Sequence, residues 1–502
     1  MNKNNTIVTL VIGLSFLWTG SAFLSWVYNV ADLLEAQGMI SSLEFLTEGI
    51  GYVFQAIGIL ITCVIARKIA IHSDLNAATD RLIKITFAVV SLADVALTYI
   101  CMTFGTLALA LTFGYILNIL HGVVAGLYIY MLTFYVDMNR RGIAFGLGYS
   151  IGSIGSYLIS IIGDSNFLTD IRAIGIYLVI VILTIVLIWV SGYDEWSVAC
   201  SVLNNSSMPD TDSTYMSYDT DPDINRKVAI RLLGLAAAVV ILLSLVKGIG
   251  FYFDFSDVWT GGMSLEYTRM FYAVGLIIAG IVNDLNRRWG GILCIAALVF
   301  PFVLILLHSA SVSGMILWII NYAVTGLYVV YRVVLFSDIA WESLRYRPIG
   351  KEKCLIYIAP CGLMFGRIGD FISTAVGIKL SPTPIILNIF AAIMFIITVV
   401  VFLTLFIRLY LGNMTMNAIG NDQDGAQTSH ETVQQGFSDH YGLTDRETLV
   451  LFHVTNKLSN KEIASELFVQ ESTVKYHVKN ILRKTGCSNR HELNSLYDNY
   501  NQ

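Results

Sequence analysis

Residues 443–493 read LTDRETLVLFHVTNKLSNKEIASELFVQESTVKYHVKNILRKTGCSNRHEL, and two pairs of polar residues in this stretch mark where helices begin. Thr444 precedes Glu447 by three positions, and Ser459 precedes Glu462 by the same spacing. This spacing is typical of a capping box, in which the two side chains satisfy backbone N–H groups that a helix start leaves unpaired. The stretch therefore predicts one helix that begins after Thr444 and a second that begins after Ser459.

The third predicted helix is the longest of the stretch. It runs from about Glu471 or Ser472 to Thr485, and Gly486 follows it as a C-cap residue. A fourth helix is expected to open at Asn489. These four short helices, with a helix-turn-helix in the middle, predict a small all-α domain.

The two faces of the third helix differ in chemistry. Its apolar stripe consists of Val474, Val478, Ile481 and Leu482. Lys475, Lys479 and Arg483 are four positions apart and share the other face. A basic stripe is often only a solvated helix face, but one packed side and one cationic side is also the layout that a DNA recognition helix needs. The formal charge of the whole chain is −5, yet residues 472–490 hold five Lys or Arg and no acid, so the local charge favours nucleic acid.

Three segments of the stretch carry a resemblance to a known family: SNKEIA at 459–464, STVKYHVKNILRKTG at 472–486 and SNR at 488–490. Together they resemble the DNA-binding domain of LuxR-type (GerE-like) transcription regulators over its full length. The resemblance implies that Lys475, Tyr476 and Lys479 enter the major groove, Tyr476 at a position that varies in the family. It also implies that the last helix contributes to a homodimer, which favours promoter sites built as inverted repeats. The DNA-binding residues that we expect are Ser472, Thr473, Lys475, Tyr476, Lys479 and Arg483.

The residues that precede this domain have the composition of a membrane protein. Across the whole chain 56% of residues are hydrophobic and only 13% are charged, which is far from the usage of soluble domains. Twelve stretches are long enough to cross a bilayer; they lie near 7–30, 43–66, 84–103, 106–134, 143–163, 172–191, 228–252, 264–284, 290–308, 314–336, 354–378 and 384–410. They predict a polytopic, twelve-helix all-α membrane domain over 1–410, with halves 1–191 and 228–410 joined by an acidic loop at 192–227.

The distribution of charge among the loops predicts the orientation. With the N-terminus inside, the inside segments hold seventeen Lys and Arg, and the outside loops hold only Arg172, Arg269 and Lys379. Because basic loops stay on the cytoplasmic side, both termini are expected in the cytoplasm, which an even number of spans allows. We therefore expect a multi-pass protein of the cytoplasmic (inner) membrane whose C-terminal domain, 441–502, lies where DNA is.

The order of six spans, a long loop and six spans resembles the major facilitator superfamily. GIVNDLNRR at 280–288 partly resembles that family's inside-loop motif, in which an aspartate follows a glycine by four positions and basic residues come next. ARKIAIHSD at 66–74, the matching segment of the first half, lacks this glycine–aspartate spacing. The resemblance implies a 6+6 helical fold.

Residues 411–440 separate the membrane domain from the C-terminal domain. They are polar and contain neither Lys nor Arg, which predicts a flexible linker. A random coil of about thirty residues spans on the order of 30 Å. The C-terminal domain is therefore expected to bind DNA close to the membrane surface.

Ionisable side chains inside membrane spans are costly and therefore mark candidate functional sites. The ligand-sensing candidates are Glu48, Asp94, His121, Arg332, Arg367 and Asp370. Plainer interpretations stand beside this one: Arg367 and Asp370, one turn apart, form an internal ion pair, and His121 is a hydrogen-bonded interior histidine. Glu44 and Lys247 lie near span ends, where such side chains snorkel to the interface. Together, the charges of both halves predict a polar central cavity.

The sequence contains no catalytic, cofactor or metal motif. It has no GxxxxGK[ST] loop, GxSxG elbow or HExxH helix, and its seven cysteines have neither metal nor disulfide spacing. We therefore expect no enzyme. The pattern predicts a membrane-embedded one-component transcription regulator whose membrane domain senses a small molecule and whose helix-turn-helix domain binds promoter DNA. One alternative is a membrane transporter with an appended regulatory DNA-binding domain, and another is a tethered factor that proteolysis of the linker releases.

Overall fold

The computed structural model describes the chain in segments. These are residues 3–72, 77–103, 105–168, 171–190, 222–252, 269–299, 314–343, 355–411, 437–438, 440–455, 458–466 and 471–500. The chain separates into two compact units, Met1–Tyr410 and Leu411–Gln502. The described residues of both units form helices and no strand, which agrees with the predicted all-α class.

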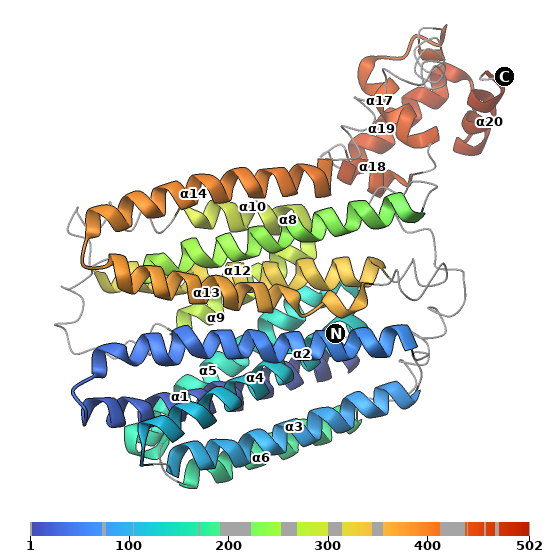
Figure 1. The fold of residues 1–502 in the computed structure, drawn as a ribbon. Helices are drawn as coiled ribbons and strands as arrows, with labels where there is room; N and C mark the ends of the chain where they lie inside the picture. The colour runs from blue at the N-terminus through green and yellow to red at the C-terminus, as the bar shows by residue number, and fades with distance from the viewer. Residues whose placement is uncertain are drawn as a thin grey trace. The chain divides into compact units, whose positions relative to one another are not determined.

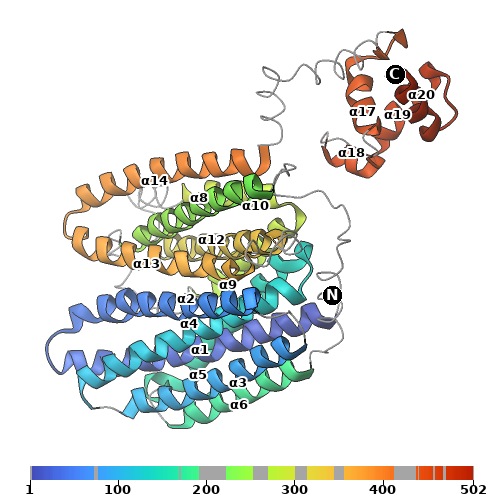
Figure 2. The ribbon, with the colours of Figure 1, turned by 45° about the vertical axis from the view of Figure 1, so that its right-hand side comes forward.

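The first unit is a membrane domain of two halves, which Figures 1 and 2 show as two sets of helices side by side. The first half contains α1 (Lys3–Glu35), α2 (Ile50–His72), α3 (Ala77–Thr103), α4 (Leu107–Tyr135), α5 (Arg141–Leu168) and α6 (Ile171–Val190). The second half contains α8 (Pro222–Ile249), α9 (Arg269–Leu285), α10 (Arg287–Leu298), α12 (Gly314–Glu342), α13 (Cys361–Leu380) and α14 (Pro384–Phe406). These apolar segments are helical because a helix satisfies every backbone polar group within the segment, as a bilayer requires.

Ten of the described helices are long and apolar enough to cross a membrane, so the chain is a multi-pass membrane protein. The described helices α9 and α10 are shorter and overlap the eighth and ninth predicted spans. The prediction of twelve spans is thus confirmed for ten. α8 begins at Pro222, inside the predicted loop, because proline suits the first position of a helix. The rest of that loop, 192–221, lies outside the described residues.

α12 lies at the centre of the membrane domain, whereas α6 and α14 lie at its periphery. In the most apolar stretch of α12, 78% of the residues are buried, against 28% for α6 and 22% for α14. The exposed side chains of α14 include Ile385, Ile389 and Ile393, as expected of a surface that faces lipid. The two halves meet along the inner helices, where α5 packs on α9 and α2 packs on α13.

The backbones of α5 and α9 approach closely across the two halves. A Cβ atom on Gly142 would lie 2.6 Å from the carbonyl oxygen of Gly280, and a Cβ atom on Gly280 would lie 2.6 Å from the carbonyl oxygen of Gly142. Both separations are shorter than van der Waals contact, so only glycine fits at this crossing. We call the end of the domain at which α1 begins the inner end, after the predicted orientation, and the opposite end the outer end.

The second unit is a small helical domain with its own core. Its described helices are α17 (Asp445–Thr455), α18 (Asn460–Glu466), α19 (Glu471–Thr485) and α20 (Arg490–Tyr500). The core side chains are apolar and include Val450, Leu451, Val454, Ile463, Val474, Ile481 and Leu493. Phe437, which falls in the range predicted as linker, is also fully buried in this core and packs on Tyr441 and Tyr497. Residues 412–436, most of the predicted linker, lie outside the described residues.

Both predicted capping boxes are present at the starts of α17 and α18. The backbone N–H of Thr444 donates to Glu447 Oε2 at 2.9 Å, and the Glu447 N–H donates back to Thr444 Oγ1 at 3.4 Å. Ser459 and Glu462 repeat the exchange at 2.6 and 3.3 Å. Gly486 follows α19 with a φ of 73°, the left-handed conformation that favours glycine at a helix end. The predicted starts of α17 and α18 and the predicted end of α19 are therefore confirmed.

Candidate functional site

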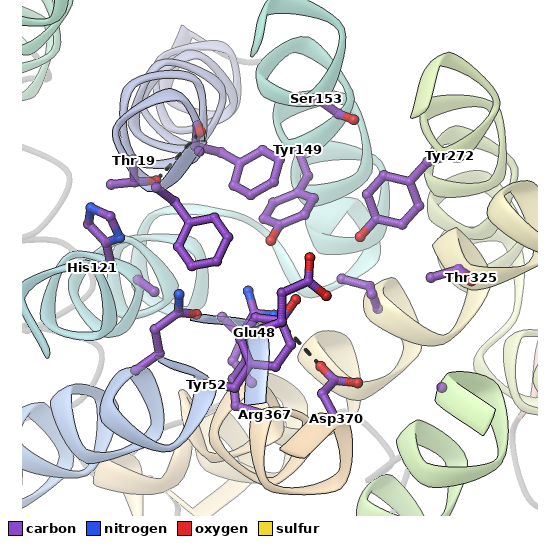
Figure 3. Close-up of a pocket in the computed structure, with 18 of the residues that line it drawn as sticks. Thr19, Glu48, Tyr52, His121, Tyr149, Ser153, Tyr272, Thr325, Arg367 and Asp370 are labelled. Atoms are coloured by element: carbon purple, nitrogen blue, oxygen red, sulfur yellow. Dashed lines mark hydrogen bonds and ion pairs between the residues drawn. The ribbon is translucent and has the colours of Figure 1, made fainter. Parts of the chain in front are cut away.

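A pocket of about 350 Å³ lies between the two halves of the membrane domain. Figure 3 shows side chains from both halves converging on this space. Among the ligand-sensing candidates, the pocket is lined by Glu48, His121, Arg332, Arg367 and Asp370. Asp94 does not line it but lies directly behind His121, with 3.2 Å between Asp94 Oδ2 and His121 Nε2. The structure therefore gathers the predicted ionisable residues around one cavity.

Asp370 on α13 is the centre of the charged cluster. Its Oδ1 atom accepts a hydrogen bond from Lys247 Nζ of α8 at 2.9 Å. Two guanidinium groups lie slightly farther away, with Arg367 Nη1 at 3.7 Å and Arg332 Nη1 at 3.9 Å from Asp370 Oδ2. The ion pair between Arg367 and Asp370 is thus part of a four-residue cluster. Lys247 is only 13% exposed and turns into this cluster, so it does not snorkel to the interface.

The two arginines of the cluster are held in different ways. Arg332 on α12 is 4% exposed, and its Nη1 atom donates to Ser244 Oγ at 3.2 Å. Gly366 on α13 makes room for it, because a Cβ atom there would lie 1.8 Å from Arg332 Nη1. Arg367 is 22% exposed and lies over the ring of Tyr52, with 4.6 Å between the guanidinium carbon and the ring centroid. This contact joins the two halves by a cation–π interaction.

The first half contributes hydrogen-bonding groups and one acidic turn. Glu48 lies in a π-helical turn at Phe45–Gly49, directly before α2. Such turns frequently occur at functional sites. Gln55 Nε2, farther along α2, donates to Asn118 Oδ1 at 2.7 Å, so Asn118 is bonded within the first half although it shares a face of α4 with His121.

One hydrogen bond crosses between the halves at the outer mouth of the pocket. The hydroxyl of Tyr252, directly after α8, donates to the carboxylate of Glu44. Glu44 is an exposed residue, as expected of a side chain at the interface, but its partner on the second half is not visible in the sequence pattern. Within the described part of the chain, no cluster of three His, Cys, Asp or Glu side chains is placed to hold a metal ion.

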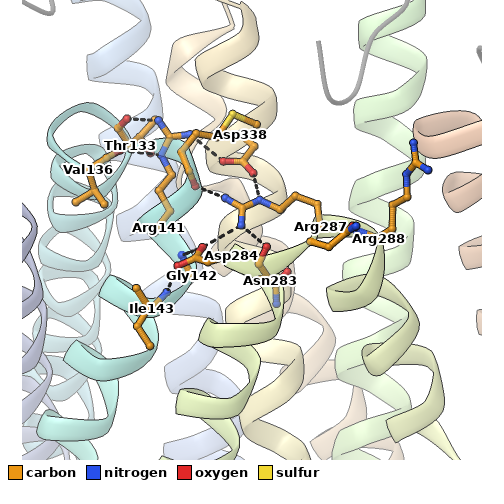
Figure 4. Close-up of polar contacts among 12 residues, drawn as sticks. Thr133, Val136, Arg141, Gly142, Ile143, Asn283, Asp284, Arg287, Arg288 and Asp338 are labelled. Atoms are coloured by element: carbon orange, nitrogen blue, oxygen red, sulfur yellow. Dashed lines mark hydrogen bonds and ion pairs between the residues drawn. The ribbon is translucent and has the colours of Figure 1, made fainter. Parts of the chain in front are cut away.

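The inner end is held by a buried ion network, which Figure 4 shows. Asp338 near the end of α12 is fully buried and accepts hydrogen bonds from Arg141 Nη1 at 2.8 Å and from Arg287 Nε at 2.7 Å. Asp284 on α9 accepts from the backbone N–H groups of Gly142 and Ile143 at 2.8 and 2.7 Å. Because these N–H groups belong to the first turn of α5, the carboxylate caps a helix of the opposite half.

The sequence pattern places the inner-end arginines in loops and does not point to their partner. Arg141 and Arg287 counted toward the orientation as loop cations, yet they are only 1% and 8% exposed. Asp338 was not among the predicted site residues. The only sign of Asp338 in the sequence is a carboxylate at the inner end of the tenth predicted span. No spacing rule connects this residue with Arg141, which lies 197 positions away.

Two thiols also meet across the halves toward the inner end. Cys63 Sγ on α2 lies 3.9 Å from Cys361 Sγ at the start of α13. Beside them, the hydroxyl of Tyr130 on α4 donates to the backbone carbonyl of Tyr357 at 2.9 Å. The two halves are therefore in direct contact at this end of the pocket.

The second candidate site is the exposed face of α19 in the C-terminal unit. Val474, Val478 and Ile481 are buried as predicted. The exposed residues of α19 include Thr473, Lys475, Tyr476, Lys479 and Arg483. The side chain of Ser472 lies outside the described residues. The exposed face thus presents three cations and a tyrosine that is 62% exposed.

Two other cations of the C-terminal unit, Lys484 and Arg490, bond to other parts of the same unit and so stabilise its fold. Lys484 Nζ donates to Glu447 Oε2 and to the carbonyl of Gly442, each at 2.7 Å. Arg490 donates to the backbone carbonyl of Leu458 and so ties α20 to the start of α18. Although partial burial raises the pKa of Glu447, the hydrogen bonds from Lys484 and Thr444 outweigh it and hold that pKa below its usual range. Lys484 and Arg490 are therefore positioned by the domain itself, whereas the α19 face points outward.

The C-terminal unit matches a family of known regulators. Residues 442–496 match the family described as "Bacterial regulatory proteins, luxR family". Over 48 residues, the chain is 52% identical to the "Nitrate/nitrite response regulator protein homolog" of Haemophilus influenzae and 44% identical to the "Spore germination protein GerE" of Bacillus subtilis. Each match covers 10% of this chain; the first covers 23% of the Haemophilus influenzae protein, and the second covers 65% of GerE. The chain thus spans about a quarter of the length of the first relative.

The membrane domain is similar in fold to a solved transporter. The crystal structure of the human organic anion transporter MFSD10 (TETRAN) aligns with a TM-score of 0.51 and 13% sequence identity, covering 81% of this chain and 99% of that one. At this identity the likeness concerns the fold alone. The chain therefore joins a helix-turn-helix domain of the luxR type at its C-terminus to a membrane domain with a major-facilitator-like fold.

Proposed function

We propose that this protein is a membrane-embedded transcription regulator. The pocket between the two halves binds a small molecule, and the C-terminal domain binds promoter DNA as a homodimer through the exposed face of α19. The membrane domain crosses the cytoplasmic membrane twelve times, with both termini in the cytoplasm. This placement follows from the excess of Lys and Arg in the inside segments.

The observation that carries the proposal is the presence of two sites in one chain. The α19 face presents Lys475, Lys479 and Arg483 to solvent, which suits phosphate and base contacts. The pocket holds buried charges at the boundary between two halves of a bundle. A ligand that contacts both halves binds one of their arrangements more tightly than another. This difference in binding free energy shifts the equilibrium between the two arrangements. Couplings of this kind are typically about 5–150-fold.

The DNA-binding part is tested with the full chain in lipid nanodiscs. Binding to DNA from the region upstream of its own gene is measured for the natural chain and for K475A/K479A. The double variant should lose specific binding and keep its thermal stability, because both lysines are exposed. R288Q/K379A is the matched control, since it removes two exposed cations of the membrane domain. Equal specific binding by natural chain and double variant would remove α19 as the recognition helix.

A transporter with an appended regulatory domain is the second candidate. The observation that favours it is the fold likeness to an organic anion transporter, whose name describes that protein and not this one. Sealed vesicles that contain the purified chain distinguish the two functions. A sensor changes its DNA binding when a ligand occupies the pocket but does not accumulate that ligand inside vesicles. Concentrative or saturable uptake that depends on the chain would favour the transporter.

A further inference from the structure

Arg332 is a buried cation with unused hydrogen-bonding capacity. A guanidinium carries five N–H donors. At Arg332, Nη1 donates to Ser244 Oγ at 3.2 Å and lies 3.9 Å from Asp370, which is beyond hydrogen-bond distance. Among the residues that the structure describes, none accepts a hydrogen bond from the buried Arg332 Nε atom. An unsatisfied donor on a buried charged group is costly, so an acceptor that another molecule brings would lower this cost.

Cations outnumber carboxylates in the cluster at Arg332, which favours an anion there. Three cations surround a single carboxylate, and Lys247 makes the shortest contact with that carboxylate, at 2.9 Å. Arg367 and Arg332, at 3.7 and 3.9 Å, remain on the pocket side of Asp370. On the opposite wall, Glu44 bonds to Tyr252 at the outer mouth, and Glu48 also lines the pocket. Two neighbouring guanidinium groups thus face the cavity, an arrangement that suits the two oxygens of one carboxylate.

Part of the remaining wall of the pocket is aromatic. Phe16 and Tyr149 stack with ring centroids 3.7 Å apart, and Tyr149 meets Tyr272 edge-on at 6.3 Å. Tyr52 lies under Arg367 on the other side of the cavity. Figure 3 shows Tyr149 and Tyr272 beside the cluster of Arg367 and Asp370. A ring of a ligand placed among these rings gains stacking and edge contacts that an aliphatic chain does not.

We propose that the ligand of this pocket is a small aromatic carboxylate. Its carboxylate bonds to Arg332 and Arg367, while Asp370 stays with Lys247, and its ring packs against Tyr149 and Tyr272. This inference rests on the proposed function, because it names the class of molecule that the pocket binds. Gly366 sets the specificity for the anion, since its missing side chain leaves the space that the Arg332 guanidinium occupies.

The test measures thermal unfolding of the purified full chain with benzoate as the probe. Benzamide has the same ring without the charge, benzylammonium has the opposite charge, and inorganic phosphate is an anion without a ring. Benzoate should raise the midpoint of unfolding in a saturable way, and the other three should not match it. The apparent affinity for benzoate should fall about tenfold or more in R367Q and in R332Q, and should stay unchanged in R288Q.

One further variant separates loss of binding from a simple folding defect, and a second tests the space around the Arg332 guanidinium. R332K keeps the charge but cannot offer two parallel N–H groups, so it should bind benzoate with an affinity between those of the natural chain and R332Q. G366A should weaken binding as well, because its methyl group displaces the guanidinium. The proposal is overturned if benzamide stabilises as well as benzoate, if phosphate does, if benzoate gives no shift, or if R332Q/R367Q binds benzoate normally. None of these results affects the DNA-binding and uptake tests, so the proposed function would stand with another ligand class.

Discussion

Replacing Asp338 by asparagine should open the inner end of the membrane domain. The Asp338 carboxylate is fully buried and receives hydrogen bonds from Arg141 at 2.8 Å and Arg287 at 2.7 Å, one from each half of the domain. Asparagine keeps the size of the side chain and removes the charge. Two buried guanidinium groups then lose their shared counterion, although Arg287 keeps its ion pair with Asp284, which also caps α5.

The magnitude follows from the burial of the network. Removing one partner of a buried ion pair costs about 3–5 kcal/mol, because the remaining charge is left unpaired in a medium of low polarity. Separation of the halves lets water reach both arginines and relieves this cost. The equilibrium between the closed and the separated inner end should therefore shift toward separation by a factor of about 100 or more, since each 1.4 kcal/mol corresponds to tenfold.

The native thiols of Cys63 and Cys361 report this change directly. Their sulfur atoms lie 3.9 Å apart across the halves, so a mild oxidant should convert them to a disulfide in a variant whose other cysteines are replaced. In the Asp338→Asn variant the rate of cross-linking should fall at least about tenfold. Asp94→Asn is the matched control, because Asp94 is equally buried but its partner His121 belongs to the same half.

The cross-linking rate decides whether the network holds the halves together. If Asp338→Asn lowers the thermal stability and leaves the cross-linking rate unchanged, the network stabilises the fold without holding the inner end closed. The same result in Asp94→Asn and Asp338→Asn would mean that loss of any buried carboxylate loosens the domain, and the reasoning given for Asp338 would fail.

Three other predictions follow from the two domains. The K475A/K479A variant should weaken DNA binding about tenfold or more and lower the slope of log affinity against log salt by about 1 per lysine, as gel shifts at several salt concentrations measure. Because the pKa of Glu447 is lowered in the folded domain, its contribution to stability is present above the unfolded value of about 4.3 and is lost as the pH falls through the folded pKa. Calorimetry should therefore show that E447Q destabilises the C-terminal domain at pH 7 and hardly at all near pH 3. In intact cells with the native cysteines replaced, a membrane-impermeant thiol reagent should label Ser256→Cys and not Asp212→Cys; the opposite pattern would invert the topology.

Local signals in the sequence predicted the C-terminal domain well. Helix ends depend on residues a few positions apart: Thr444 and Glu447 bond to backbone groups at the start of α17, and Gly486 ends α19. Short sequence spacings are therefore enough to predict them. The apolar stripe of α19 predicted its buried face for the same reason. In the membrane domain, long apolar runs predicted ten helices that the structure confirms by length and composition.

The contacts between the two halves could not be predicted from the sequence. In the sequence, each of Arg141, Arg287 and Lys247 is explained as a solvated cation near a helix end. Only the packing of the helices brings Arg141 and Arg287 to Asp338, and Lys247 to Asp370. A charge near a helix end is equally compatible with water, lipid headgroups and a distant carboxylate. The choice among these depends on which helices are neighbours, and a single sequence does not specify that.

The glycine crossing of α5 and α9 has a mechanical consequence. Where Gly142 and Gly280 meet, the contact is between main chains, and the adjoining Asp284 side chain of α9 accepts hydrogen bonds from backbone N–H groups of α5. Side chains that interdigitate must change rotamer when two helices shift, and a close-packed interior resists that change. At the glycine pair itself no rotamer has to change when one helix rolls against the other, while the Asp284 hydrogen bonds hold the first turn of α5 to α9. We therefore expect the two halves to turn about this crossing when they move, and a single added methyl group at either glycine to push α5 and α9 apart.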